Sequence, residues 1–149
     1  MILSIVIITM FVVMEFIAWF MHKFIMHGIA WNLHKDHHKK DNHFSFFELN
    51  DFFFVFFAFL SIIAFVSWSY TNSIVALGIA IGICIYGFVY FFVHDLFIHQ
   101  RIKVLSQTNN KYLLSIRRAH KIHHKNREKH GGECFGMLWV PLKYFKTKR

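Results

Sequence analysis

Cysteine, proline and acidic side chains are scarce in this chain of 149 residues. It has 2 cysteines, 1 proline and 8 Asp and Glu residues, against 17 Lys and Arg. The two cysteines form no CxxC motif, so neither a disulfide framework nor an iron–sulfur cluster is expected. The 7 glycines form no nucleotide-binding fingerprint. The chain also lacks low-complexity segments and interdomain linkers, and residues 1–149 are expected to form a single domain.

Charged residues are also missing from three long stretches. Glu15 is the only charged side chain in residues 1–21, and residues 52–70 and 74–93 have none. Each stretch is long enough to cross a hydrocarbon core about 30 Å thick. With 56% hydrophobic residues and a mean hydropathy of +0.40, the chain is too apolar for an ordinary soluble domain. We therefore expect an all-α integral membrane helical bundle with three spans at about 1–21, 52–70 and 74–93.

The first stretch is expected to be a retained anchor. It has neither the basic start of a signal peptide nor a small-x-small cleavage site before His22. Lys and Arg number 4 between the first and second spans and 13 after the third. The positive-inside rule then places both basic segments, 22–51 and 94–149, in the cytoplasm as one histidine-rich cap. Topology and anionic lipid also account for the net charge of +9, and no nucleic-acid-binding motif accompanies it.

Histidine is unusually frequent, with 12 copies, and ten of them follow one pattern twice. Each copy has a His-x4-His pair and then a His-x2-His-His triplet. The first copy is His22, His27, His34, His37 and His38, and the second is His94, His99, His120, His123 and His124. Positions i, i+3 and i+4 share a helix face, so each triplet is expected to point at one site. His43 and His130, which lie outside the pattern, are expected at the surface.

The His-x4-His pairs do not fit one face of a regular helix. Residues five apart lie about 140° apart on an α-helix. A helix end, a π-bulge or two separate metal ions must therefore be involved.

Ten imidazoles with few carboxylates nearby predict a centre of two divalent metal ions. Imidazole suits iron, zinc and copper. Two octahedral ions offer about 12 positions, so about 10 protein ligands would leave one or two for water or dioxygen. A structural zinc ion needs only four ligands and no open position. Because neutral imidazole is the ligand, metal release is expected below about pH 6, where protons compete for the nitrogen.

Two carboxylates are candidate members of the site. Asp95 follows a predicted ligand, and it is either a helix-end residue or partner of Arg101, or an acceptor that orients an imidazole N–H. Glu15 lies two helical turns before His22, about 10 Å deeper in the membrane. An ionisable group at that depth is a functional hypothesis by default, and the alternative is a hydrogen bond within the bundle.

Four further patterns bear on packing. Residues 133–142 are apolar but too short to span, so a re-entrant or interfacial segment that closes over the site is expected. Residues 105–130 predict a basic helix that carries the second triplet. Gly78 and Gly82 permit a close approach between helices, and Gly87 lies in the same span. Six Phe residues between 52 and 59 form either lipid-facing bulk or one wall of a groove for a flat substrate.

The histidine ladder resembles that of the membrane fatty acid hydroxylase/desaturase superfamily. Its flanking residues are similar to those of the bacterial β-carotene 3-hydroxylases: His27-Gly28 with Trp31 before His34, the segments 93–101 and 119–124, and 134–136 before Pro141. The similarity covers roughly residues 10–142. Leu96 departs from the pattern, because members of the family often have Gly there. This difference affects loop packing and leaves the ligand set unchanged.

The resemblance implies a non-haem diiron monooxygenase whose metal ligands are the ten ladder histidines. Such an enzyme uses O2 and two electrons to hydroxylate C3 of a carotenoid β-ring, taking β-carotene through β-cryptoxanthin to zeaxanthin. An external donor of ferredoxin type supplies the electrons, and its acidic surface would meet Arg117, Arg118, Lys121 and Lys125. The hydrocarbon substrate enters laterally from the lipid bilayer. The resemblance also implies a bacterial inner membrane.

Related histidine-ladder enzymes are the first alternative: a carotenoid ketolase, a fatty acid or sterol hydroxylase, or a desaturase. A non-enzymatic metal transporter or sensor is the alternative from another class. A transporter needs polar ligands in the middle of the membrane, whereas the second and third spans are uncharged and every histidine lies outside the spans or at their ends.

Overall fold

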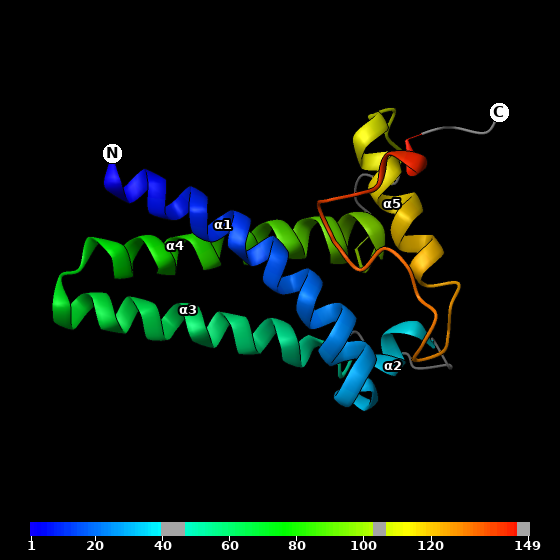
Figure 1. The fold of residues 1–149 in the computed structure, drawn as a ribbon, viewed down its shortest axis with the longest axis horizontal. Coiled ribbons are helices and arrows are strands. Elements are labelled where there is room, and N and C mark those ends of the chain that lie inside the picture. Colours follow the sequence, from blue (N-terminus) through cyan, green and yellow to red (C-terminus); the bar gives the residue numbers. More distant parts are fainter. Residues whose placement is uncertain (40–46, 103–106, 146–149) are drawn as a thin grey trace.

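Helices make up the regular secondary structure of the described residues, which are 1–39, 47–102 and 107–145 of the computed structural model. Two long helices change type without a break. α1 (Ile2–Phe20) continues as the π-helix η1 (Met21–Ile29), and α4 (Ile74–Tyr90) continues as the π-helix η2 (Phe91–Ile98). α3 (Asp51–Thr71) lies between them in sequence. Figure 1 shows these three rods together, with α2 (Trp31–His38), α5 (Lys111–His123) and the 3₁₀ turn η3 (Leu142–Tyr144) gathered at one end.

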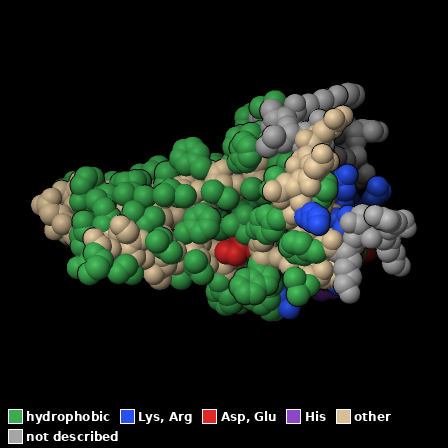
Figure 2. All heavy atoms as spheres, turned by 90° about the horizontal axis from the view of Figure 1, so that it is seen from above, with side chains coloured by type: hydrophobic (Ala, Val, Ile, Leu, Met, Phe, Trp, Pro, Cys, Tyr) green, Lys and Arg blue, Asp and Glu red, His purple; other side chains and the backbone are tan. Residues whose placement is uncertain are grey.

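All three rods are long and apolar enough to cross a membrane, over Ile2–Ile29, Asp51–Thr71 and Ile74–Ile98. The predicted all-α bundle with three spans is confirmed, and the chain is a membrane protein. The first and third rods run past the predicted ends because each continues through its His-x4-His pair. Phe59 and Phe88 on the outer faces are 57% and 70% exposed. In Figure 2, hydrophobic side chains cover most of the length of the molecule, and Lys and Arg side chains gather at one end.

Two glycines determine how closely α1 and α4 approach. A Cβ atom at Gly78 would lie 2.6 Å from Val6 Cγ1, and one at Gly82 would lie 2.6 Å from Met10 Cβ. Close packing at this pair of glycines is therefore confirmed. Gly87 has a different environment, because the nearest atom to a Cβ there would be 4.0 Å away.

α5 is shorter than the helix predicted over 105–130. The Asn110 side chain accepts hydrogen bonds from the backbone N–H groups of Tyr112 and Leu113 at 3.0 and 3.1 Å. This N-cap starts the helix at Lys111. Residues 124–141 contain no helix, and residues 105 and 106 lie outside the described part of the chain. The second triplet therefore sits at the end of α5, where the chain turns towards the first triplet.

Candidate metal centre and membrane cavity

The two π-helices explain the geometry of the His-x4-His pairs. Backbone hydrogen bonds in a π-helix join residues five apart, so residues i and i+5 lie about one turn apart on the same side. The His99 N–H donates to the His94 carbonyl oxygen at 2.9 Å, and their ring centroids are 4.6 Å apart. The ring centroids of His22 and His27 on η1 are 5.3 Å apart. Of the three arrangements that the sequence left open, the chain uses the π-helix.

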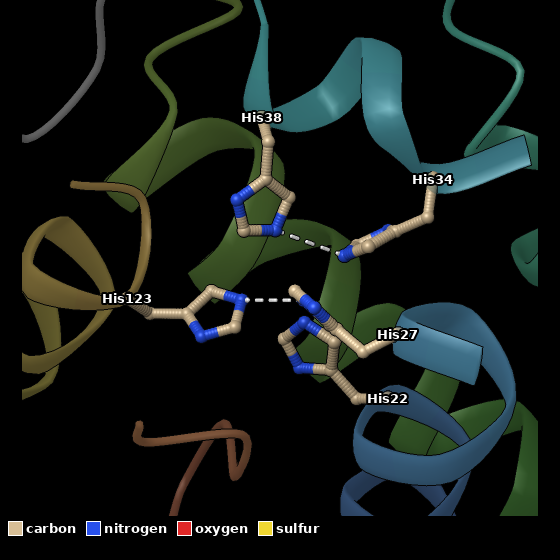
Figure 3. A group of neighbouring side chains, drawn as sticks. All are labelled: His22, His27, His34, His38 and His123. Carbon is tan, nitrogen blue, oxygen red and sulfur yellow. Dashed lines mark hydrogen bonds between the residues drawn. The ribbon is translucent and has the colours of Figure 1, made fainter. Parts of the chain in front are cut away.

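Nine of the ten ladder histidines form two groups whose ligating nitrogens lie within 4.8 Å of one another. The first, named here the carbonyl cluster, contains His22, His27, His34, His38 and His123 (Figure 3). The second, the carboxylate cluster, contains His37, His94, His99 and His120. The tenth ladder histidine, His124, lies between them, with its ring centroid 4.4 Å from that of His38 and 4.5 Å from that of His120. Outside the ladder, His130 is exposed as predicted, and His43 lies outside the described residues.

Each triplet is divided between the two clusters. α2 places His34 and His38 in the carbonyl cluster and His37 in the carboxylate cluster, while α5 contributes His123 to the first and His120 to the second. The expectation that each triplet points at one site is therefore wrong. The divided positions are about 100° apart on α2 (i+3 and i+4) and about 60° apart on α5 (i and i+3). A helix that lies between two sites can therefore present them to different ones. Each cluster takes ligands from both copies of the pattern.

Carbonyl oxygens lie behind every ring of the carbonyl cluster. Each ring presents Nδ1 to one such oxygen at 2.7–3.0 Å. The pairs are His22 with Phe135 O, His27 with Lys129 O, His34 with Asn50 Oδ1, His38 with Asn126 O, and His123 with Glu133 O. A carbonyl oxygen only accepts hydrogen bonds, so Nδ1 carries the proton in all five rings.

Carboxylates lie behind two rings of the other cluster. His37 Nδ1 donates to Glu48 Oε2 at 2.6 Å, and His94 Nδ1 lies 3.5 Å from Asp95 Oδ1. Arg101 pairs with Asp95 at 3.0 Å and with Glu48 at 3.1 Å, and the paired charges raise the pKa of its guanidinium against the effect of burial. Asp95 is thus the Arg101 partner that the sequence suggested. Its role in orienting His94 stays a prediction.

The sequence reasoning did not find three side chains of this network, Glu48, Asn50 and Asp51, at the start of α3. Asp51 Oδ1 accepts from Arg101 at 2.7 Å, and the other two accept from imidazoles of the clusters. A signal was present in the sequence, because these polar side chains directly precede an uncharged span in a chain with only 8 acidic residues. That position puts them at the same end of the rods as the ligands.

The inward nitrogens of the carbonyl cluster fit metal ions. Because Nδ1 holds the proton, each Nε2 carries a lone pair. Nitrogens that carry lone pairs nevertheless face each other at short distances: His27 Nε2 lies 3.3 Å from His123 Nε2, and His34 Nε2 lies 3.1 Å from His38 Nε2 (Figure 3). His22 Nε2 is buried without a hydrogen-bond partner among the described residues. Two lone pairs cannot form a hydrogen bond, whereas ligands about 2.1 Å from a shared ion lie about 3 Å apart when adjacent.

Burial keeps these imidazoles neutral. It lowers the pKa of His38 from 6.5 to about 4 and that of His123 to about 3. The pKa values of His34 and His124 fall to about 2, again mainly through burial. Neighbouring histidines add to the effect, because two imidazolium charges would repel each other. Neutral imidazole is the form that binds metal, so the release expected below about pH 6 is revised to a lower pH.

A cavity of about 600 Å³ connects the membrane-spanning rods with both clusters. Its polar end is lined by His22, His34, His94 and His120. Phe53 and Phe57 of α3 line its apolar part, whereas Phe52 and Phe59 on the same helix are 55% and 57% exposed. The Phe-rich stretch thus has an exposed face and a face that lines the cavity. The binding of a flat substrate against the second face stays a prediction.

Glu15 is half-buried and packs against residues 136–139, which are far away in the sequence. Its Oε1 accepts from the backbone N–H groups of Met137, Leu138 and Trp139, and its Oε2 accepts from the Tyr86 hydroxyl. The predicted hydrogen bond within the bundle exists, and most of its donors come from the segment expected to close over the site. Insertion of that segment into the bilayer stays a prediction.

Comparisons with known proteins identify the family of the chain. The fatty acid hydroxylase family matches residues 7–145, a range that contains the whole histidine ladder. The chain is 40% identical over 128 residues to a β-carotene hydroxylase of Pantoea ananas, covering 86% of this chain and 71% of the relative. β-Carotene hydroxylases of Pseudescherichia vulneris and Paracoccus sp. (strain PC1) are 35% and 33% identical, covering 92% and 91% of this chain and 76% and 83% of the relatives. No solved structure matches the chain. The chain belongs to the fatty acid hydroxylase family.

Proposed function

We propose that this protein is a carotenoid 3-hydroxylase, which uses O2 and two iron ions to hydroxylate the β-rings of β-carotene, through β-cryptoxanthin to zeaxanthin. The observation that carries the proposal is the apolar cavity whose polar end is formed by histidines of both clusters. The three relatives named above are β-carotene hydroxylases, which supports the substrate class.

The ladder histidines would hold the two ions as neutral imidazoles. The oxygen atoms behind Nδ1 of His37 and of the five rings of the carbonyl cluster fix the orientation of these rings and keep Nε2 free for metal. Groups behind the ligands tune a metal site in this way. His124 is half-buried between the clusters, and its Nε2 atom is buried with no hydrogen-bond partner among the described residues. It would complete the set of ten. When bound, the iron pair supplies the activation of O2 and the insertion of one oxygen atom into a C–H bond.

The cavity would bind the ring end of the carotenoid and exclude water from it. Its volume of about 600 Å³ lies in the range of small-molecule sites. Phe54 and Phe88 line it and are also 42% and 70% exposed on the outside of the rods. These residues therefore border a route from the lipid-facing surface to the histidines, which suits a substrate that dissolves only in the bilayer.

We infer that the clusters face the cytoplasm of a bacterial inner membrane, because the basic residues gather at their end of the rods. A ferredoxin-type donor would dock on this side. Arg117 and Arg118 bind backbone carbonyl oxygens of the protein itself, whereas Lys121 and Lys125 are exposed. Lys121 and Arg127 also border a second cavity of about 310 Å³ that is lined by five ladder histidines. This basic rim gives an acidic donor a short path to the clusters.

Pigment analysis in a β-carotene-producing host tests the proposal. Expression of the wild-type chain should convert β-carotene into β-cryptoxanthin and zeaxanthin in the presence of O2, and His120→Ala should give no conversion. Unchanged β-carotene with the wild-type chain would contradict the proposal. A keto product would favour the ketolase alternative, and metal binding without any oxygenated product would favour a sensor or transporter.

A further inference from the structure

Glu15 is the only acidic residue in the first membrane-spanning rod, and four hydrogen bonds hold its carboxylate. Oε1 accepts from the N–H groups of residues 137, 138 and 139 at 3.0, 2.8 and 3.0 Å. Oε2 accepts from the Tyr86 hydroxyl at 2.8 Å. A carboxylate removed from water needs such donors. The fit is close, since a Cβ atom at Gly136 would lie 3.0 Å from the Trp139 carbonyl oxygen and 3.5 Å from Glu15 Oε1.

The bound segment, residues 133–139, is named here the strap. Within the described ranges it forms no backbone-to-backbone hydrogen bond. Side chains hold it instead: Glu15 binds its amides, and the Tyr112 hydroxyl donates to the Leu138 carbonyl oxygen at 2.8 Å. Removing the Glu15 acceptors would leave the amides of residues 137–139 without these partners, and Met137 among them is buried. The conformation of the strap therefore depends on a carboxylate more than 120 residues earlier in the chain.

The strap in turn orients two rings of the carbonyl cluster. The Phe135 carbonyl oxygen accepts from His22 Nδ1 and the Glu133 carbonyl oxygen accepts from His123 Nδ1, both at 2.9 Å. The Phe135 ring also packs against the His27 ring, with the centroids 5.2 Å apart. No strap residue supplies an acceptor to the carboxylate cluster in the described hydrogen bonds.

The strap also forms part of the cavity wall. Phe135, Gly136 and Met137 line the cavity beside Met14 of α1. Glu15 thus holds one segment that serves both the orientation of the ligands and the shape of the substrate site.

We propose that Glu15 is a positioning residue. Its carboxylate holds the strap so that the strap carbonyls orient His22 and His123 towards a metal ion in the carbonyl cluster. Loss of Glu15 weakens metal binding in that cluster and leaves the carboxylate cluster intact. This inference rests on the proposed metal centre.

The test compares purified proteins in detergent by Co²⁺ titration and by hydrogen exchange at residues 137–139. Glu15→Leu removes all acceptors and should accelerate exchange of these amides at least tenfold. It should also weaken the binding of one Co²⁺ ion by about 10–100-fold, the effect typical of outer groups at metal sites, while a second ion binds as in the wild type. Glu15→Gln keeps one carbonyl oxygen for the amides and should restore most of the lost affinity.

Two further variants make the result decisive. Met10→Ala removes a contact of α1 with α4 without touching the strap. This variant should bind both ions, and its strap amides should exchange as slowly as those of the wild type. Gly136→Ala keeps Glu15 but places a Cβ 3.0 Å from the Trp139 carbonyl oxygen of the strap. It should reproduce the selective loss of one ion, even where Glu15→Leu does not fold. Wild-type protein that binds no Co²⁺ would contradict the proposed metal centre. The wild type could instead bind two ions, with the same metal affinities and the same amide exchange rates in Glu15→Leu or Gly136→Ala. That result would contradict only the role of Glu15.

Discussion

The carbonyl and carboxylate clusters use the same ligand but differ in what lies behind it. Every ring of the first donates to a neutral carbonyl oxygen, and four of the five acceptors are backbone atoms. Two rings of the second face carboxylates that Arg101 ties together. A carboxylate raises the basicity of an imidazole ligand and offsets the charge of the ion. Two ions held by these clusters would therefore be inequivalent, with tighter binding expected in the carboxylate cluster.

The division of each triplet gives the largest expected effect. His34→Ala and His37→Ala alter neighbouring positions of α2, yet each should remove the ion of a different cluster. Carotenoid conversion should fall by more than about 100-fold in both, because a lost ligand exceeds the 10–100-fold effect of an outer group. The measurement is metal content per chain together with pigment analysis, and His130→Ala, at an exposed position, is the control.

Double variants sharpen that prediction. His37→Ala combined with His94→Ala, both in the carboxylate cluster, should remove one ion in total. His37→Ala combined with His34→Ala should remove both ions. Equal losses in the two double variants would show that the clusters are not separate sites.

The acceptors behind the rings give the next largest effect. Glu48→Gln replaces the carboxylate behind His37 and should weaken metal binding in the carboxylate cluster by about 10–100-fold. Asn50→Asp makes the reverse change behind His34 and should tighten the carbonyl cluster. Isothermal titration with Co²⁺ measures both, with Glu128→Gln at an exposed position as the control. Unchanged affinities would mean that the acceptors orient the rings without tuning them.

Acid should affect stability before it affects the folded metal site. The pKa of His38 is about 4 in the folded chain and 6.5 without the effects of burial. Below about pH 6.5 the unfolded chain takes up protons that the folded chain excludes, so the free energy of unfolding of the metal-free protein should decrease between about pH 6.5 and pH 4. Thermal unfolding at stepped pH measures this. Metal-loaded protein should keep its ions at pH 5, and their complete release there would contradict the buried, neutral state of the ligands.

The smallest effect concerns the packing that supports both clusters. Gly82→Ala would place a Cβ 2.6 Å from Met10 Cβ and 3.1 Å from the Ile7 carbonyl oxygen. The strain should destabilise the fold by about 1–3 kcal/mol, and metal stoichiometry should be unchanged. Gly87→Ala is the matched control, since its Cβ would meet no atom closer than 4.0 Å. Thermal unfolding in detergent compares them, and equal melting temperatures would show that α1 does not need the close approach.

The features that were predicted from the sequence are local ones. Three uncharged or nearly uncharged runs locate the spans. The repeated spacing singles out ten histidines, nine of which lie in the two clusters. The π-helix was among the three solutions considered for the His-x4-His pairs. The choice between them needed the backbone, since residue types alone do not fix whether a helix continues as α or π.

The remaining features depend on contacts between distant segments. His37 and His123 join clusters with partners from the other copy of the pattern, because α2 and α5 lie between the two sites. Four of the five acceptors of the carbonyl cluster are backbone oxygens, which exist at every residue and leave no mark in the sequence. Three of the four donors to Glu15 are backbone amides, which likewise leave no mark in the sequence. Glu48, Asn50 and Asp51 could have been suspected, because they are polar side chains directly before an uncharged span.

Metal stoichiometry of the purified wild-type protein tests the central claim most directly. Metal-free protein is titrated with Fe²⁺ under anaerobic conditions, and iron is counted per chain after removal of the excess. The two clusters predict two ions per chain, bound with unequal affinities. A single ion, or none, would contradict a centre built from two sets of histidines.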